Sequence, residues 1–142
     1  MSTFTWGAFA LACVIALGPG GAAYGKQKLE DAGEASANAW LTLIDQGKYG
    51  DSWEQAAQLF KGAVTKDDWK RTLAGVRTPL GKMISRKVKS RHYTESLPGA
   101  PDGKYVVIQY ETTFEHKKSA IETVTPMVDP DGRWRVSGYF IK

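Results

Sequence analysis

The chain has 142 residues, of which 42% are hydrophobic, 11% aromatic and 24% charged. These values are typical of a globular protein and exclude a disordered chain, a collagen-like repeat and a polytopic membrane protein. The 19 Lys and Arg residues against 15 Asp and Glu residues give a formal net charge of +4, and all of these charged residues lie at or after Lys26. Charge therefore separates residues 1–25 from the rest of the chain.

Residues 1–25 have the pattern of a secretory signal peptide. The apolar run 4–17 is followed by a Gly/Pro turn and small residues, and we place a cleavage site after Ala23 or Gly25. The run is shorter than the roughly 18 to 20 apolar residues of a transmembrane helix. We therefore expect a periplasmic or secreted protein that contacts the membrane only through this segment if it is uncleaved. Retention as an anchor and lipidation at Cys13 are the alternatives.

Few residues in the sequence have the chemistry of a metal or nucleophilic site. Cys13 is the only cysteine and would leave with the signal peptide, so thiolate catalysis and Cys-based zinc binding are excluded for residues 26–142. The two histidines, His92 and His116, lack metal-ligand spacing, and no phosphate-binding loop or hydrolase motif occurs. We expect no metal or cofactor and assign no catalytic residue.

Residues 26–142 predict one domain that begins with helices and ends with strands. Helices are expected from Leu29 to Gly47, from Ser52 through Phe60 and from Thr65 to Pro79. Ser52 and Thr65 are the expected N-caps, and Pro79 is expected to end the third helix. Strands are expected at Met83–Leu97, Lys104–Glu115, Ser119–Val128 and Arg133–Lys142. The fold class is α+β, with N-terminal helices packed on a curved four-stranded antiparallel meander.

Basic residues concentrate between Lys66 and Arg91, where nine basic side chains accompany two acidic ones. At the period of a strand, Lys87, Lys89 and Arg91 share one face, and almost no aromatic residues are interleaved with them. This pattern favours a solvated strand face and no nucleic-acid partner. Binding of an anionic envelope polymer is the alternative.

Arg86 has the opposite parity and shares an apolar face with Ile84 and Val88. An arginine on a face covered by helices must meet a carboxylate or line a cavity, because burying an unpaired charge is very costly. Its available partners are Asp45, Glu54 and Glu122. A buried ion pair that joins the sheet to a helix is the structural interpretation, and ligand contact is the functional one.

A curved sheet capped by helices tends to leave an apolar pocket. The candidate pocket residues are Trp40, Asp45, Trp53, Arg86, Tyr110, Glu122 and Phe140. Our leading hypothesis is a non-enzymatic domain that binds a small apolar or amphipathic ligand or a protein partner, with a homodimer formed through the outer sheet face. The alternative is a small cofactor-free enzyme with Asp45, Glu122 and Arg86 as an acid/base site.

Segments spread over most of residues 26–142 resemble a bacterial family of exported proteins, domain of unknown function family 4019. They are Trp40-Leu41, Asp45–Tyr49, Ser52-Trp53, Val76–Gly81, Ser85-Arg86, Pro98–Tyr105, Phe114, Glu122-Thr123 and Gly138-Tyr139. That family has no established activity. The order of elements also resembles the nuclear transport factor 2-like, or cystatin-like, cone. That resemblance implies a fold shared by isomerases, dehydratases and non-catalytic binding domains, so it does not select a function.

Overall fold

The computed structural model describes residues 20–142, which form four helices and four strands. The helices are α1 (Gly20–Asp45), α2 (Tyr49–Glu54), α3 (Gln58–Ala63) and α4 (Lys66–Leu80). The strands are β1 (Met83–Thr94), β2 (Tyr105–Phe114), β3 (Lys117–Val128) and β4 (Trp134–Ile141). The expected order of helices followed by strands is confirmed, and so is the α+β class.

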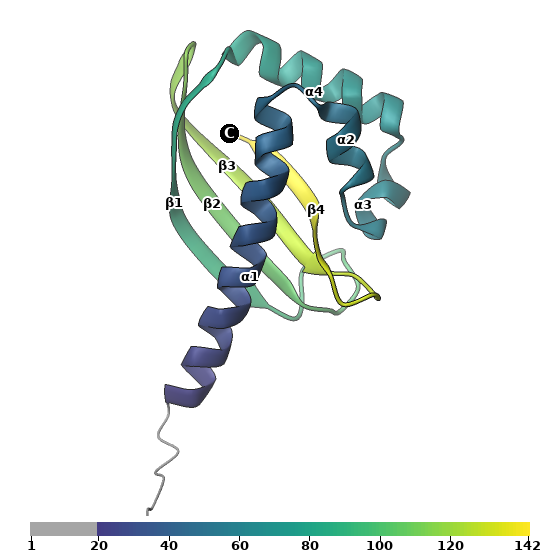
Figure 1. Ribbon diagram of the computed structural model, residues 1–142, viewed down its shortest axis with the longest axis vertical. Helices are drawn as coiled ribbons and strands as arrows, with labels where there is room; N and C mark the ends of the chain where they lie inside the picture. Colours follow the sequence, from purple (N-terminus) through teal and green to yellow (C-terminus); the bar gives the residue numbers. More distant parts are fainter. Residues whose placement is uncertain (1–19) are drawn as a thin grey trace, which may run out of the picture.

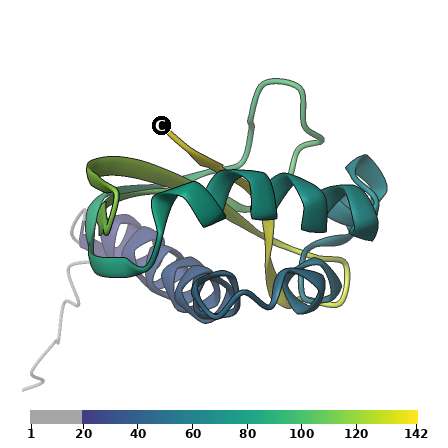
Figure 2. The ribbon, with the colours of Figure 1, turned by 90° about the horizontal axis from the view of Figure 1, so that it is seen from above.

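The four strands form one antiparallel sheet in the order β1-β2-β3-β4, as expected for a meander. Helix α1 crosses the sheet, and its first turns project beyond the strands (Figure 1). Seen from above, α1 and α2 lie on one side of the sheet, whereas the loop between β1 and β2 projects on the other (Figure 2). We call the face toward α1 the inner face and the opposite one the outer face.

Alternation along β2 explains why the inner face holds the core. Val106, Ile108, Tyr110, Thr112 and Phe114 are all buried, and the residues between them are only half-buried. Helix α1 approaches this face closely at a glycine: a Cβ on Gly33 would lie 2.8 Å from a methyl group of Val106. The glycine therefore sets the distance between helix and sheet.

Aromatic side chains fill the space between the helices and the inner face. Trp40 and Trp69 have ring centroids 6.0 Å apart, and Tyr139 packs edge-on against Trp40 with centroids 5.3 Å apart. Phe60 meets Trp69 at 4.7 Å. The indole N–H groups of Trp40 and Trp69 donate to Ser52, to its backbone oxygen at 2.8 Å and its hydroxyl at 2.9 Å respectively. The interior is thus occupied by the protein's own rings.

Helix α1 begins at Gly20, earlier than the expected Leu29. The proposed cleavage sites at Ala23 and Gly25 are therefore helical in the structure. The apolar run 4–17 and Cys13 lie outside the described residues.

The single helix expected from Ser52 through Phe60 is wrong, because the chain forms two short helices there. The backbone N–H of Ala57 donates to the Val136 carbonyl at 2.8 Å, so the chain leaves helical geometry to bind the edge of β4. Ser52 lies within α2 and donates to Tyr49 O at 2.6 Å instead of capping. Tertiary contact has overridden the local capping pattern.

The N-cap expected at Thr65 is confirmed, since its hydroxyl accepts from Asp68 N at 3.2 Å. Pro79 does not end α4, which continues to Leu80. Only Leu80 follows Pro79 in the helix. The helix ends at Gly81, whose φ of 74° is in the region that favours glycine.

The shared face expected for Lys87, Lys89 and Arg91 is wrong. A register shift between Val88 and Ser90 places Arg91 opposite Ile108, on the inner face. There its guanidinium forms ion pairs with three acidic residues of α1, namely Glu30, Asp31 and Glu34. The bulge therefore converts an expected solvated cation into a link between sheet and helix.

Candidate functional site

Arg86 lies on the inner face of β1 and reaches the C-terminal end of α1. Its Nη1 and Nη2 atoms donate to the two carboxylate oxygens of Asp45 at 2.7 and 2.9 Å. Its Nε donates to Glu122 Oε1 at 2.7 Å. The buried arginine with carboxylate partners is thus present, with Asp45 and Glu122 as the partners. The third candidate, Glu54, pairs with Lys66 at 2.9 Å on the surface.

A second arginine, Arg77 of α4, shares the same carboxylate. Its Nη2 donates to Asp45 Oδ1 at 3.0 Å, and its guanidinium carbon lies 4.8 Å from the centre of the Phe114 ring. The Arg77 side chain is only 5% exposed, and its Nε and Nη1 atoms have no hydrogen-bond partner among the described residues. Its contact with the face of the aromatic ring offsets part of the cost of burying these donors.

Glu122 of β3 is fully buried, with 0% of its side chain exposed. Besides Arg86, it accepts from the Thr112 hydroxyl at 2.5 Å on Oε1 and from the Tyr139 hydroxyl on Oε2. Three donors from β1, β2 and β4 therefore converge on one carboxylate of β3. We call Asp45, Arg77, Arg86 and Glu122, with Thr112 and Tyr139, the inner charged cluster.

The cluster shifts the proton affinities of two of its members. Burial by itself would lower the pKa of Arg86, but its hydrogen bonds to Asp45 and Glu122 outweigh burial, and the net shift is upward. Burial raises the pKa of the Tyr139 hydroxyl well above its ordinary value, and the adjacent Glu122 carboxylate raises it further. Arg86 therefore stays charged and Tyr139 stays protonated across the physiological range.

The inner charged cluster has no net charge, and its members hydrogen-bond to one another. Two guanidinium groups and two carboxylates cancel in charge, and both carboxylate oxygens of Asp45 and of Glu122 already accept hydrogen bonds from the protein. A general base must reach a substrate proton, and a general acid must donate one. The hydrogen bonds of the two carboxylates join α1 and α4 to all four strands of the sheet.

The structure brings together some of the candidate pocket residues and separates others. Trp40 is buried in the core, and Trp53 packs against it while its indole donates to Val64 O at 2.8 Å. Tyr110 is buried on the inner face and donates to Asn38 Oδ1 at 2.8 Å. Phe140 lies opposite Thr123 on the outer face and is 58% exposed. Arg86 thus contacts both Asp45 and Glu122, whereas Phe140 points to the opposite face of the sheet.

Sequence reasoning missed three members of the inner charged cluster, Arg77, Thr112 and Tyr139. Arg77 lies four residues after the buried Leu73 and eight after Trp69, so the helical period already placed it on the core side of α4. Tyr139 is the neighbour of Phe140, and the strand period allowed either to face inward. The sequence therefore indicated that Arg77 faces the core, but it did not show whether Tyr139 or Phe140 faces inward.

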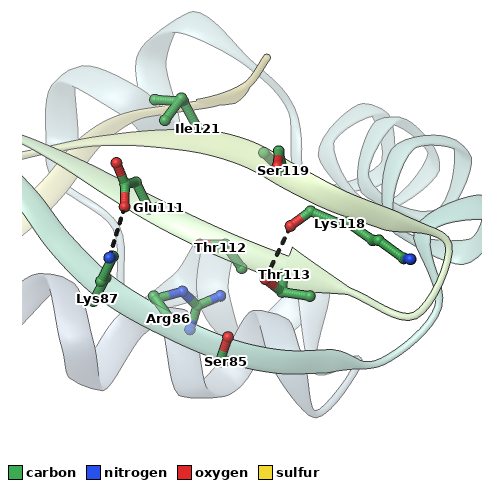
Figure 3. A pocket seen from close by; sticks show the side chains of 10 residues that line it. Ser85, Arg86, Lys87, Glu111, Thr112, Thr113, Lys118, Ser119 and Ile121 are labelled. Carbon is green, nitrogen blue, oxygen red and sulfur yellow. Dashed lines mark hydrogen bonds and ion pairs between the residues drawn. The ribbon is translucent and has the colours of Figure 1, made fainter.

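Several hollows of the described surface have the size of ligand sites, and one of about 340 Å³ is lined by Asp45 and Arg77 of the inner charged cluster. A hollow of about 520 Å³ lies over β1, β2 and β3, and its lining includes outer-face residues together with Arg86 and Thr112 of the inner charged cluster (Figure 3). Lys87 pairs there with Glu111 at 3.1 Å, and Thr113 donates to Lys118 O at 2.9 Å (Figure 3). On the helix side, a cleft of about 360 Å³ opens between α1 and β4, which we call the α1–β4 cleft. It is lined by Ser36, Ala39, Trp40, Leu43, Gln55, Arg133, Trp134, Arg135 and Val136.

Within residues 20–142, no three His, Cys, Asp or Glu residues are grouped so that they could hold a metal ion. No helix in the same part of the chain is both long enough and apolar enough to cross a membrane.

A family model described as "Protein of unknown function (DUF4019)" matches residues 36–139, which is well over half of the chain. The chain belongs to this family. The DUF4019 match runs from the middle of α1 to β4 and includes every member of the inner charged cluster. No curated protein matches the chain. Membership of DUF4019 thus gives the domain a family whose function is unknown.

Proposed function

We propose that this DUF4019 protein is an exported, non-enzymatic domain that binds a small amphipathic molecule. The observation that carries its non-enzymatic part is the pairing of the inner charged cluster, in which every oxygen of the two carboxylates accepts a hydrogen bond from a protein donor. Because aromatic rings fill the rest of the interior, a ligand would bind in a surface cleft.

The α1–β4 cleft has the composition of such a site. Its volume of about 360 Å³ lies within the usual range for small-molecule pockets, roughly 300 to 1,000 Å³. Trp40 and Val136 are buried beside it, Leu43 and Trp134 are half-buried, and Arg133 and Gln55 are exposed polar residues. Apolar side chains combined with a few polar groups suit a ligand that is apolar over part of its surface and polar at one end.

The proposal is tested by native mass spectrometry and a thermal-shift screen of the purified protein. We expect a small molecule to be retained, or an amphipathic compound in the screen to raise Tm, and Ala39→Leu to abolish the effect. Ala39 is exposed on α1 and lines the cleft, so a leucine there fills space without disturbing the helix. If compounds raise Tm equally in Ala39→Leu, the cleft is not their site and the proposal is contradicted.

The enzyme alternative makes a different demand on the cluster. Acid/base chemistry by Asp45 or Glu122 requires the carboxylate to leave its arginine and meet substrate. Turnover that disappears in Glu122→Gln, a variant that keeps the shape and hydrogen-bonding oxygen of the side chain, would support the enzyme and contradict our proposal.

The outer face supports a second candidate function, the binding of a second copy of this chain. Phe140 is 58% exposed there, and the face carries both signs of charge, at Lys87 and Glu111. A two-fold interface places the same patch on both subunits, so a patch with both signs can complement itself. Light scattering of the wild type and of Phe140→Lys tests this: a dimer that the substitution dissociates supports the candidate, and a monomer contradicts it.

A further inference from the structure

Two hydrogen-bond donors that line the α1–β4 cleft have no protein partner among the described residues. Trp134 is the only tryptophan within residues 20–142 whose indole N–H has no hydrogen-bond partner, since those of Trp40, Trp53 and Trp69 are all bound. Arg133 is exposed and forms no ion pair with any described residue. The cleft therefore offers an indole N–H and a guanidinium.

The residues that line the cleft carry a net positive charge. No carboxylate lines it, whereas two arginines do. The charge of Arg135 is already matched, because its guanidinium binds Asp129 at 2.9 Å and Asp131 at 2.8 Å in the hairpin between β3 and β4. The hydrogen bond from Arg135 contributes to lowering the pKa of Asp131 to about 2, so that pair persists at neutral pH. The charge that remains available at the cleft is that of Arg133.

We infer that the α1–β4 cleft selects an amphipathic monoanion, a carboxylate carried on an apolar body. Arg133 binds the carboxylate as a charge-assisted donor, and the indole N–H of Trp134 is a second donor within the same cleft. The apolar body occupies the space beside Ala39, Leu43 and the edge of Trp40. This inference rests on the proposed function and adds the chemical class of the ligand.

The geometry also assigns different roles to neighbouring residues. Arg133 sets the preference for an anion, whereas Arg135 holds the β3–β4 hairpin through its two aspartates. The Ser36 hydroxyl donates to the Trp134 carbonyl at 3.0 Å and so fixes β4 against α1 at the cleft. Ser36 and Arg135 are positioning residues, and Arg133 is the arginine that contacts the ligand.

The test uses two probes of the same shape, 2-naphthoate and 2-naphthamide, titrated calorimetrically into the purified protein. We expect 2-naphthoate to bind at least about tenfold more tightly than 2-naphthamide, because a hydrogen bond to a charged group is worth more than a neutral one. Arg133→Gln is expected to remove that difference. Lys89→Gln, which makes the same charge change on β1 away from the cleft, is expected to preserve it.

The possible outcomes separate the inference from the function on which it rests. If both probes bind equally and Ala39→Leu abolishes both, the cleft binds ligands without selecting an anion, and this inference alone is overturned. If neither probe binds, or if Ala39→Leu binds both as the wild type does, the function proposed for the cleft fails as well. Equal loss of 2-naphthoate binding in Lys89→Gln and Arg133→Gln indicates attraction to net charge and overturns the role of Arg133.

Discussion

Replacing Arg86 with methionine isolates the energetic role of the inner charged cluster. Methionine keeps most of the length of the side chain but removes three hydrogen bonds, two to Asp45 and one to Glu122. Asp45 is 18% exposed and keeps Arg77, whereas Glu122 is fully buried and keeps only two neutral donors, Thr112 and Tyr139. The main penalty is therefore a buried carboxylate without a cation.

Removing one partner of a buried ion pair costs about 3 to 5 kcal/mol. Domains of this size are stable by about 5 to 15 kcal/mol, so Arg86→Met is expected to remove a large fraction of the free energy of unfolding. Urea unfolding followed by far-ultraviolet circular dichroism measures the loss. Arg71→Met is the matched control, since it breaks an exposed ion pair with Asp68 and is expected to change stability by less than about 1 kcal/mol.

The double variant Arg86→Met/Glu122→Gln separates the buried charge from lost packing. Glutamine retains an oxygen that can accept from Thr112 and Tyr139, but it carries no charge. We expect the double variant to be more stable than Arg86→Met alone, with a coupling energy of at least about 1 kcal/mol. A loss of less than about 1 kcal/mol for Arg86→Met, or strict additivity in the cycle, would refute the role given to the cluster.

Four further predictions concern stability. Tyr139→Phe removes a donor to a buried carboxylate and is expected to cost about 1 to 3 kcal/mol in urea unfolding; no change would mean that the hydrogen bond is dispensable. Because the folded-state pKa of Tyr139 is raised above the value of about 10 in the unfolded chain, its contribution is complete below pH 10 and decreases as the pH rises further. Unfolding measured from pH 9 to 12 should show this decrease, and a smaller one in Tyr139→Phe; identical slopes would contradict the shift. Gly33→Ala places a Cβ against Val106 and is expected to cost about 1 to 3 kcal/mol by thermal unfolding, whereas a stabilised variant would show that α1 can move away from the sheet. Thr65→Ala removes the N-cap of α4 and should cost about 1 kcal/mol, which calorimetry can detect; an unchanged Tm would show the cap to be unimportant.

The meander and its strand order were predictable because hydrophobic period and turn chemistry are local. The inward direction of Arg86 followed from the same parity, and burial cost required a carboxylate partner. Choosing Asp45 and Glu122 over Glu54 needed the fold, since Glu54 lies on α2 at the surface with Lys66. Charge and parity thus predicted the kind of contact, and three-dimensional packing selected the residues.

Two errors have the same physical origin, which is non-local bonding of the backbone. The bulge between Val88 and Ser90 reverses the parity of β1, so Arg91 faces α1. The hydrogen bond from Ala57 to Val136 interrupts the expected second helix. Neither event has a signal in the residues concerned, because each depends on a partner strand that lies far away in the sequence.

The α1–β4 cleft combines α1 with the start of β4, about a hundred residues later in the chain. Trp134 was visible as one of several tryptophans, but which indole N–H lacks a partner depends on Ser52 and Val64, which bind the other three. The candidate pocket inferred from the sequence therefore named Trp40 but missed Arg133 and Trp134.

The most direct test of the account follows the tryptophan indole signals in a ¹H–¹⁵N NMR titration of the protein with 2-naphthoate. The Trp134 indole signal, assigned with Trp134→Phe, is predicted to shift in a saturable manner, while those of Trp53 and Trp69 stay in place. Saturable shifts at Trp69 with none at Trp134 would place the ligand in the interior beside Tyr139 and contradict both the closed cluster and the binding cleft.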